Sequence, residues 1–183
     1  MSSTILYHGT LSMFDTVDIA KGKGYKDFGK GFYLTGDKNH AIRLVERNRQ
    51  IEVKRRELLQ QPQSIIPMYL YKYELDADLL TCQDINVRQF HDDEVMEWVE
   101  FVLANRATAT KSHDYDIVMG ATADDDTRLS LQIYRLGGYG NVGSTIAKNA
   151  LIAALKLNVY PTQIYIGTQR VADVLKFIER MTL

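Results

Sequence analysis

Residues 26–35 read KDFGKGFYLT, and the interpretation of the whole chain starts from this stretch. Two glycines flank Lys30, and the aromatic segment at residues 32–34 follows at once. Glycine has no Cβ and adopts backbone conformations that are closed to other residues, so the segment predicts a pliable, cationic loop that runs directly into a β-strand. What such a loop is shaped to hold is the main question that the sequence poses.

The composition favours a single globular domain, residues 1–183, because 45% of the 183 residues are hydrophobic and 25% are charged. Lys and Arg total 22 and Asp and Glu total 23, so no overall basic field is available to hold nucleic acid. The single cysteine, Cys82, argues against a disulfide framework and a thiolate metal site and suits a reducing compartment. No apolar run has membrane-spanning length, and the N-terminal residues lack the features of a signal peptide. We therefore expect a cytoplasmic protein without membrane contact.

The pattern of apolar residues predicts short strands alternating with amphipathic helices, which is an α+β fold. Strands are expected at residues 5–8, 32–34, 65–75, 79–82, 115–119 and 163–166. Helices are expected at residues 38–59, 95–103, 127–136, 144–157 and 171–178. The helix at residues 38–59 is charged nearly all round in its later part, so we expect it to project into solvent or to cover something polar.

Several familiar motifs do not fit their usual functions. Gly138, Gly140 and Gly143 spell G-x-G-x-x-G, but the preceding TRLSLQIYRLGG reads as a helix, whereas a dinucleotide-binding fingerprint follows a strand. A flexible loop between two helices is the better interpretation. The four histidines have no paired ligand spacing, so no metal site is expected. The aspartates at residues 124–126 are expected to cap the helix that follows them, rather than to do chemistry.

Three expected strand ends each present a polar or aromatic residue. These are YHGT at residues 7–10, Tyr33 at the start of the second strand, and Gln163 at the start of a late strand. Taken singly, each residue more often has a structural role than a functional one. His8 is then a core histidine with its hydrogen bonds made within the protein, Tyr33 a half-buried strand residue and Gln163 a surface amide. Their joint occurrence in this order is what indicates a common site.

The chain resembles the ADP-ribosyltransferase superfamily, in the His-Tyr-Glu branch that diphtheria toxin shares with the poly-ADP-ribose polymerases. The similarity is carried by GYKDFGKGFYLTGD at residues 24–37, which resembles the glycine loop and strand of the polymerases, and by YHGT at residues 7–10. It is closer still to a family of uncharacterised small bacterial domains assigned to that fold, which share YHG, DFGKGFYLT, a strand followed by ADD, and a late strand led by Gln. The resemblance implies a split β-sandwich of two small antiparallel sheets around an NAD cleft, flanked by helices.

The resemblance also implies roles for individual residues toward NAD, which is a substrate here, with no metal required. The backbone of Gly9 would pair with the nicotinamide carboxamide, His8 would bond a ribose hydroxyl, and Tyr33 would stack on the nicotinamide ring. The glycines of the loop would shape the cleft wall, and Lys30 would face either the diphosphate or water. The expected catalytic residues are His8, Tyr33 and Gln163, and the expected NAD-binding residues are His8, Gly9, Thr10, Gly29, Lys30, Gly31, Phe32 and Tyr33.

The chain departs from the family pattern at Gln163, which occupies the position of the catalytic glutamate. A carboxylate there stabilises the oxocarbenium-like transition state, and losing its charge would cost roughly 2–4 kcal/mol. If that charge is what limits the site, Gln163→Glu should raise turnover. A second aromatic that sandwiches nicotinamide in the polymerases also has no equivalent in NHAIRL at residues 39–44.

The function that this implies is mono-ADP-ribosyl transfer from NAD to a protein or nucleic-acid acceptor, in a bacterial toxin, defence or effector domain. Whether the charged helix at residues 38–59 recognises a target or a neutralising partner protein stays open. Two alternatives stay open. One is a catalytically weak or inactive module of the same fold that binds NAD or ADP-ribose. The other is an RNA 2′-phosphotransferase, although the Arg/His set that this chemistry needs is not evident.

Overall fold

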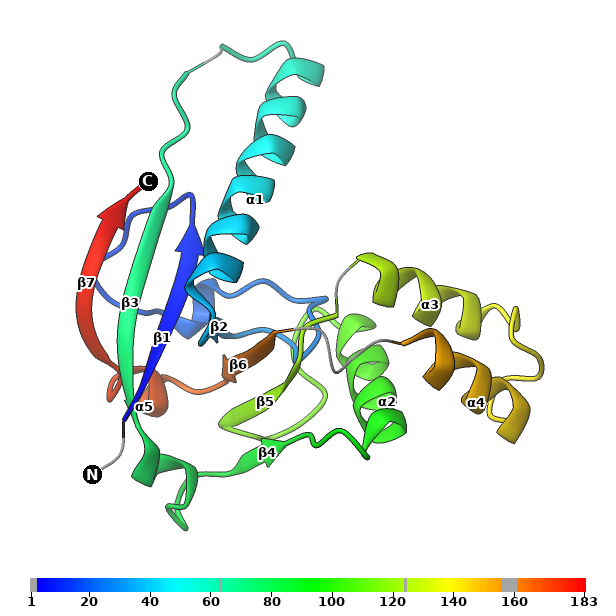
Figure 1. Ribbon diagram of the computed structural model, residues 1–183. Helices are drawn as coiled ribbons and strands as arrows, with labels where there is room; N and C mark the ends of the chain where they lie inside the picture. The colour runs from blue at the N-terminus through cyan, green and yellow to red at the C-terminus, as the bar shows by residue number, and fades with distance from the viewer. Residues whose placement is uncertain (1–2, 63, 124, 156–160) are drawn as a thin grey trace.

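The computed structural model describes residues 3–62, 64–123, 125–155 and 161–183. Its centre is one mixed sheet of seven strands in the order β4-β5-β6-β2-β1-β3-β7 (Figure 1). All neighbouring strands are antiparallel except β4 and β5, which are parallel. The strands are β1 (Ser3–Thr10), β2 (Phe32–Thr35), β3 (Tyr69–Asp76), β4 (Val87–Gln89), β5 (Ile117–Ala121), β6 (Thr162–Ile166) and β7 (Lys176–Thr182). The α+β class is therefore confirmed.

The expectation of two separate sheets differs from this arrangement, because the strands form one continuous hydrogen-bonded sheet. The two halves of the sheet nevertheless meet at a narrow junction. In the part of the chain that the structure describes, β1 and β2 share the single registered pair Tyr7 and Thr35, whereas β1 pairs with β3 along its whole length. The strand ends beyond this pair, which carry His8 and Tyr33, are thus the place where the sheet comes closest to splitting.

Helix α1 (Lys38–Leu58) starts directly after β2 and is capped by Asp37, whose side chain accepts hydrogen bonds from two backbone N–H groups of the first turn. Its first turns bury Ala41 and Val45 against the sheet. The later turns bury no residue and extend beyond the strands (Figure 1). The predicted projection of this charged helix into solvent is confirmed.

Three helices pack together beside the half of the sheet that contains β5 and β6. They are α2 (Val95–Arg106), α3 (Asp125–Arg135) and α4 (Thr145–Ala154). The core on this side contains Phe28, Trp98, Val102, Leu131, Leu151 and Tyr165. The loop of Gly138, Gly140 and Gly143 joins α3 to α4, as predicted, and is not preceded by a strand. Asp124 lies outside the described residues, so its expected capping role is not described.

Strand β4 has no counterpart among the predicted strands, and the last two residues of the helix expected at 144–157 lie outside the described residues. Three other predicted elements differ clearly from the structure. The strand at residues 65–75 begins only at Tyr69. Residues 77–80 form a 3-10 turn rather than a strand, because the Asp76 side chain accepts the N–H of Asp78 and starts a turn. The C-terminal helix covers only α5 (Gln169–Ala172), and the chain then continues as β7.

The change from helix to strand at the C-terminus follows from an open sheet edge. Val171 and Leu175 are buried as a helical stripe requires, but Val174 and Ile178 are exposed. Residues 176–182 instead complete the ladder of β3, and Phe177 packs at 5.9 Å from the ring of Tyr73. Hydrogen bonds to the unpaired backbone groups of β3 thus stabilise a strand here more than the local apolar pattern stabilises a helix. Among the described residues, no helix has the length and apolarity needed to cross a bilayer.

Candidate functional site

The glycine loop is tied to Tyr33 by the phenol hydroxyl. This hydroxyl donates to the carbonyl of Gly29 at 2.7 Å and accepts the N–H of Phe28 at 3.1 Å. The ring of Tyr33 lies edge-on to that of Tyr165, with 5.3 Å between centroids. Burial raises the pKa of Tyr33 above its ordinary value, so the phenol stays protonated. The hydroxyl of Tyr33 therefore holds the loop, and its ring is the part left to contact a ligand.

The loop glycines are required by packing within the chain itself. Gly29 has φ +88, a left-handed conformation that favours glycine, and a Cβ there would lie 2.6 Å from the Cβ of Lys111. A Cβ at Gly31 would lie 2.2 Å from the ring of Tyr165. The carbonyl of Lys30, between them, accepts the hydroxyl of Tyr165 at 2.9 Å. The glycine loop thus packs closely against β6 and against the segment that follows α2. This packing is a structural reason for the glycines, in addition to the expected role in ligand binding.

The imidazole of His8 lies at the junction between β1 and β2. Its Nδ1 is 2.8 Å from the backbone carbonyl of Tyr33, and its ring packs at 4.4 Å from Phe32 and 6.0 Å from Phe14. Because a carbonyl only accepts, Nδ1 carries the proton and Nε2 is left as an acceptor. Burial lowers the pKa of His8 to about 4, so the ring is neutral at neutral pH.

The residues that follow His8 have local structural roles. A Cβ at Gly9 would lie 2.3 Å from the carbonyl of Ala41, so glycine allows α1 to pack directly on β1. The hydroxyl of Thr10 accepts the N–H of Ser12 at 3.2 Å. The predicted contacts of Gly9 and Thr10 with NAD remain predictions beside these observations.

Gln163 is buried and joined to two residues that the sequence did not single out, Asp27 and Arg106. Its Nε2 donates to Oδ2 of Asp27 at 2.8 Å and to the carbonyl of Ala121 at 3.2 Å. Asp27 in turn forms an ion pair with Arg106, with 2.6 Å between Oδ1 and Nη2. The one sequence signal for this role of Asp27 is its position within KDFGKG, two residues before Gly29.

The three expected catalytic residues are brought to adjacent strands, because β6, β2 and β1 are neighbours in the sheet. Tyr33 pairs with Tyr165 and Thr35 with Gln163, so the side chains of Tyr33 and Gln163 point to the same face. His8 contacts Phe32, which precedes Tyr33 and points to the opposite face. The three strand ends are therefore adjacent, and His8 contacts the backbone of Tyr33, but the imidazole lies on the opposite face of the sheet from the phenol ring and the carboxamide, so the three side chains do not converge.

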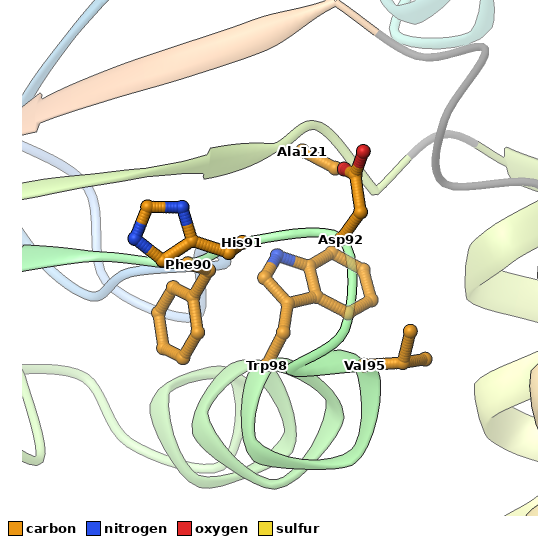
Figure 2. A pocket seen from close by; sticks show the side chains of 6 residues that line it. All are labelled: Phe90, His91, Asp92, Val95, Trp98 and Ala121. Carbon is orange, nitrogen blue, oxygen red and sulfur yellow. The ribbon is translucent and has the colours of Figure 1, made fainter.

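A hollow lies on the face of Gln163, next to Ala121. It is lined by Phe90, His91, Asp92, Val95, Trp98 and Ala121 (Figure 2). Trp98 is 2% exposed, and among the described residues nothing accepts a hydrogen bond from its indole N–H. Ala121, which lines the hollow, is also the residue whose carbonyl accepts from Gln163. The hollow thus adjoins the Asp27–Gln163 contact.

Comparison with known proteins places the chain in a family that is defined by sequence. Residues 4–177 match the family described as "Protein of unknown function (DUF3990)", and the chain belongs to this family. The matched range contains every candidate site residue discussed above. No curated protein and no solved structure matches the chain.

Proposed function

We propose that the chain is an NAD-dependent mono-ADP-ribosyltransferase of the His-Tyr-Glu type, with Gln163 in the place of the glutamate. The proposal rests first on the resemblance of YHGT and DFGKGFYLT to that superfamily. The finer fold, an NAD cleft at the split between two halves of the sheet, is part of the same proposal. The narrow β1–β2 junction at Tyr7 and Thr35 supports it.

The observation that carries the proposal is the state of His8. A neutral imidazole with Nδ1 bound to the carbonyl of Tyr33 presents Nε2 as a fixed acceptor. A ribose hydroxyl is a donor that such a nitrogen accepts. The ring of Tyr33 lies on the neighbouring strand but on the opposite face, so the proposal has the ligand reach it through the split between β1 and β2 and stack its nicotinamide there.

The reaction would be substitution at C1′ of the nicotinamide ribose. The bond between C1′ and the pyridinium nitrogen breaks, its electron pair stays on nitrogen, and neutral nicotinamide leaves. A nucleophile of the acceptor forms the new bond to C1′ and loses its proton to solvent. Groups that accept hydrogen bonds from the ribose hydroxyls stabilise the positive charge that develops on the ring.

A second candidate function is a module that binds NAD or ADP-ribose without turnover. One observation favours it: the side chain at the glutamate position is a neutral amide whose N–H groups are already bonded within the chain. Binding is then retained while the electrostatic contribution to the transition state is weak.

The two candidates are separated by incubation of the protein with nicotinamide-labelled NAD, with and without cell extract. Release of nicotinamide that falls at least tenfold in His8→Ala supports the transferase. Arg55→Gln is the control, because it changes a largely exposed side chain on the later part of α1, outside the proposed site. Saturable NAD binding without release supports the module. If the protein neither binds NAD nor releases nicotinamide, both candidate functions are wrong.

A further inference from the structure

Both N–H groups of Gln163 are committed to acceptors. Asp27 Oδ2 takes one at 2.8 Å, and the carbonyl of Ala121 takes the other at 3.2 Å. A carboxylate and a carbonyl offer no proton, so turning the amide over would place its oxygen against two acceptors. The orientation of the Gln163 carboxamide is therefore fixed by its surroundings.

Asp27 is itself held from three sides. Arg106 Nε donates to Oδ1 at 2.8 Å, and the N–H of Ala123 donates to Oδ2 at 3.1 Å, beside the bond from Gln163. The residue is only 8% exposed. Arg106 also donates to the carbonyl of Ala123 at 3.2 Å. The carboxylate thus has a fixed position and a charge partner, and it polarises the amide that donates to it.

The remaining polar atom of Gln163 is the carbonyl oxygen, Oε1. No donor of the described residues bonds it, and it is not among their fully buried polar atoms without a partner, unlike Nε1 of Trp98. We infer that Asp27 and Arg106 are positioning residues. They hold the Gln163 carboxamide in one orientation, so that its Oε1 accepts a hydrogen bond from a hydroxyl group of the ligand. The inference rests on the proposed function in one respect: the hydroxyl in question is a ribose hydroxyl of NAD.

This arrangement reverses what the sequence alone implies for Gln163→Glu. The introduced carboxylate would lie about 3 Å from that of Asp27 and would face the carbonyl of Ala121 as well. Two carboxylates at this separation cannot both ionise without strong repulsion. The substitution should therefore impair the site rather than restore a missing charge.

The test uses four full-length proteins: the wild type, Gln163→Glu, Asp27→Asn, and the double variant Asp27→Asn/Gln163→Glu. In the double variant the asparagine Nδ2 donates to the introduced carboxylate, the N–H of Ala123 loses its acceptor at Oδ2, and one negative charge remains near Arg106. Asp116→Asn is the matched control, because Asp116 is another buried aspartate paired with an arginine, Arg170, and has no contact with Gln163. Nicotinamide release from NAD and urea unfolding are measured from pH 5 to pH 8.

At pH 7.5 we expect release to fall at least tenfold in each single variant and to return to within about threefold of wild type in the double variant. Release by Gln163→Glu should rise as the pH is lowered, since one proton relieves the carboxylate pair, and the double variant should lose this dependence. A purely structural role predicts instead that release follows the folded fraction and that the double variant is no better than either single one. Full or increased release by Gln163→Glu would overturn the inference.

If the wild type releases no nicotinamide, the proposed enzyme activity is wrong, but the inference about Asp27 and Gln163 can still be tested. The measurement is then urea unfolding. A carboxyl group whose pKa is raised by folding contributes stability at low pH and loses it as the pH rises through the folded-state pKa. Relative to wild type, Gln163→Glu should therefore lose stability as the pH rises from 5 to 8, and the double variant should not. An unchanged pH profile for Gln163→Glu would show that the two carboxyl groups do not meet.

Discussion

The Nδ1 atom of His8 lies 2.8 Å from the backbone carbonyl oxygen of Tyr33, across the one junction at which β1 and β2 diverge. In a continuous ladder a backbone N–H would occupy this place. Here a side chain does so, and the imidazole becomes part of the connection between the two halves of the sheet. The second proton of a charged ring would go to Nε2, so this bond is kept on protonation, and burial of the ring is what opposes the charge.

The first prediction concerns the stability of the protein below neutral pH. Since folding lowers the pKa of His8 from 6.5 to about 4, the unfolded chain binds more protons in this interval. Stability should then fall as the pH drops from about 6.5 to 4, by up to about 3 kcal/mol from this residue. Urea unfolding at a series of pH values checks it. His8→Gln should flatten the profile in this window, and an identical profile in the variant would contradict the assignment.

The second prediction separates the hydroxyl of Tyr33 from its ring. Tyr33→Phe removes the partner of Phe28 N–H and Gly29 C=O and should cost about 1–3 kcal/mol in the free energy of unfolding. The matched control is Tyr165→Phe, which loses only its bond to the carbonyl of Lys30 and should cost about 1 kcal/mol. Because the ring is retained, NAD binding by folded Tyr33→Phe should survive, as measured by calorimetry. Loss of binding in a folded variant would assign the hydroxyl itself to the ligand.

The third prediction tests the packing of the glycine loop. Gly31→Ala places a Cβ against the ring of Tyr165 and should destabilise the fold by about 1–3 kcal/mol. Gly36→Ala is the control, since nothing lies within 4 Å of a Cβ at that position. Thermal unfolding of the two variants should differ clearly. Equal midpoints would mean that the loop is not pressed against β6.

The fourth prediction concerns the ion pair beneath Gln163. Arg106→Gln leaves the buried carboxylate of Asp27 without its charge partner and should cost about 3–5 kcal/mol. Arg55→Gln removes a surface pair with Glu52, in which the arginine side chain is 61% exposed, and should change stability by about 0–1 kcal/mol. Urea unfolding measures both. A small effect of Arg106→Gln would mean that water replaces the guanidinium at Asp27.

The elements that could be predicted from the sequence are those specified by neighbouring residues. The glycine loop and the strand after it are adjacent along the chain, and Asp37 caps α1 through two amides of its first turn. The charged later half of α1 is recognisable because it has no apolar face to bury. The helix–loop–helix at α3 and α4 also follows from local pattern, since the glycines are preceded by a helical period.

Other features depended on contacts between distant segments. Residues 176–182 carry a helical pattern but become β7 because the edge of β3 offers unpaired backbone groups. Gln163 and Asp27 are 136 residues apart, and each alone reads as an ordinary polar residue.

The sequence by itself thus determined the strand-end motifs, the glycine loop and membership of the family of unknown function, because short-range backbone preferences and side-chain types suffice for them. Only the tertiary structure decided that the strands form one sheet, that His8 is neutral, and that the amide of Gln163 faces a carboxylate. Hydrogen-bond direction and charge pairing depend on which groups meet after folding, and that information is absent from any one stretch of the chain.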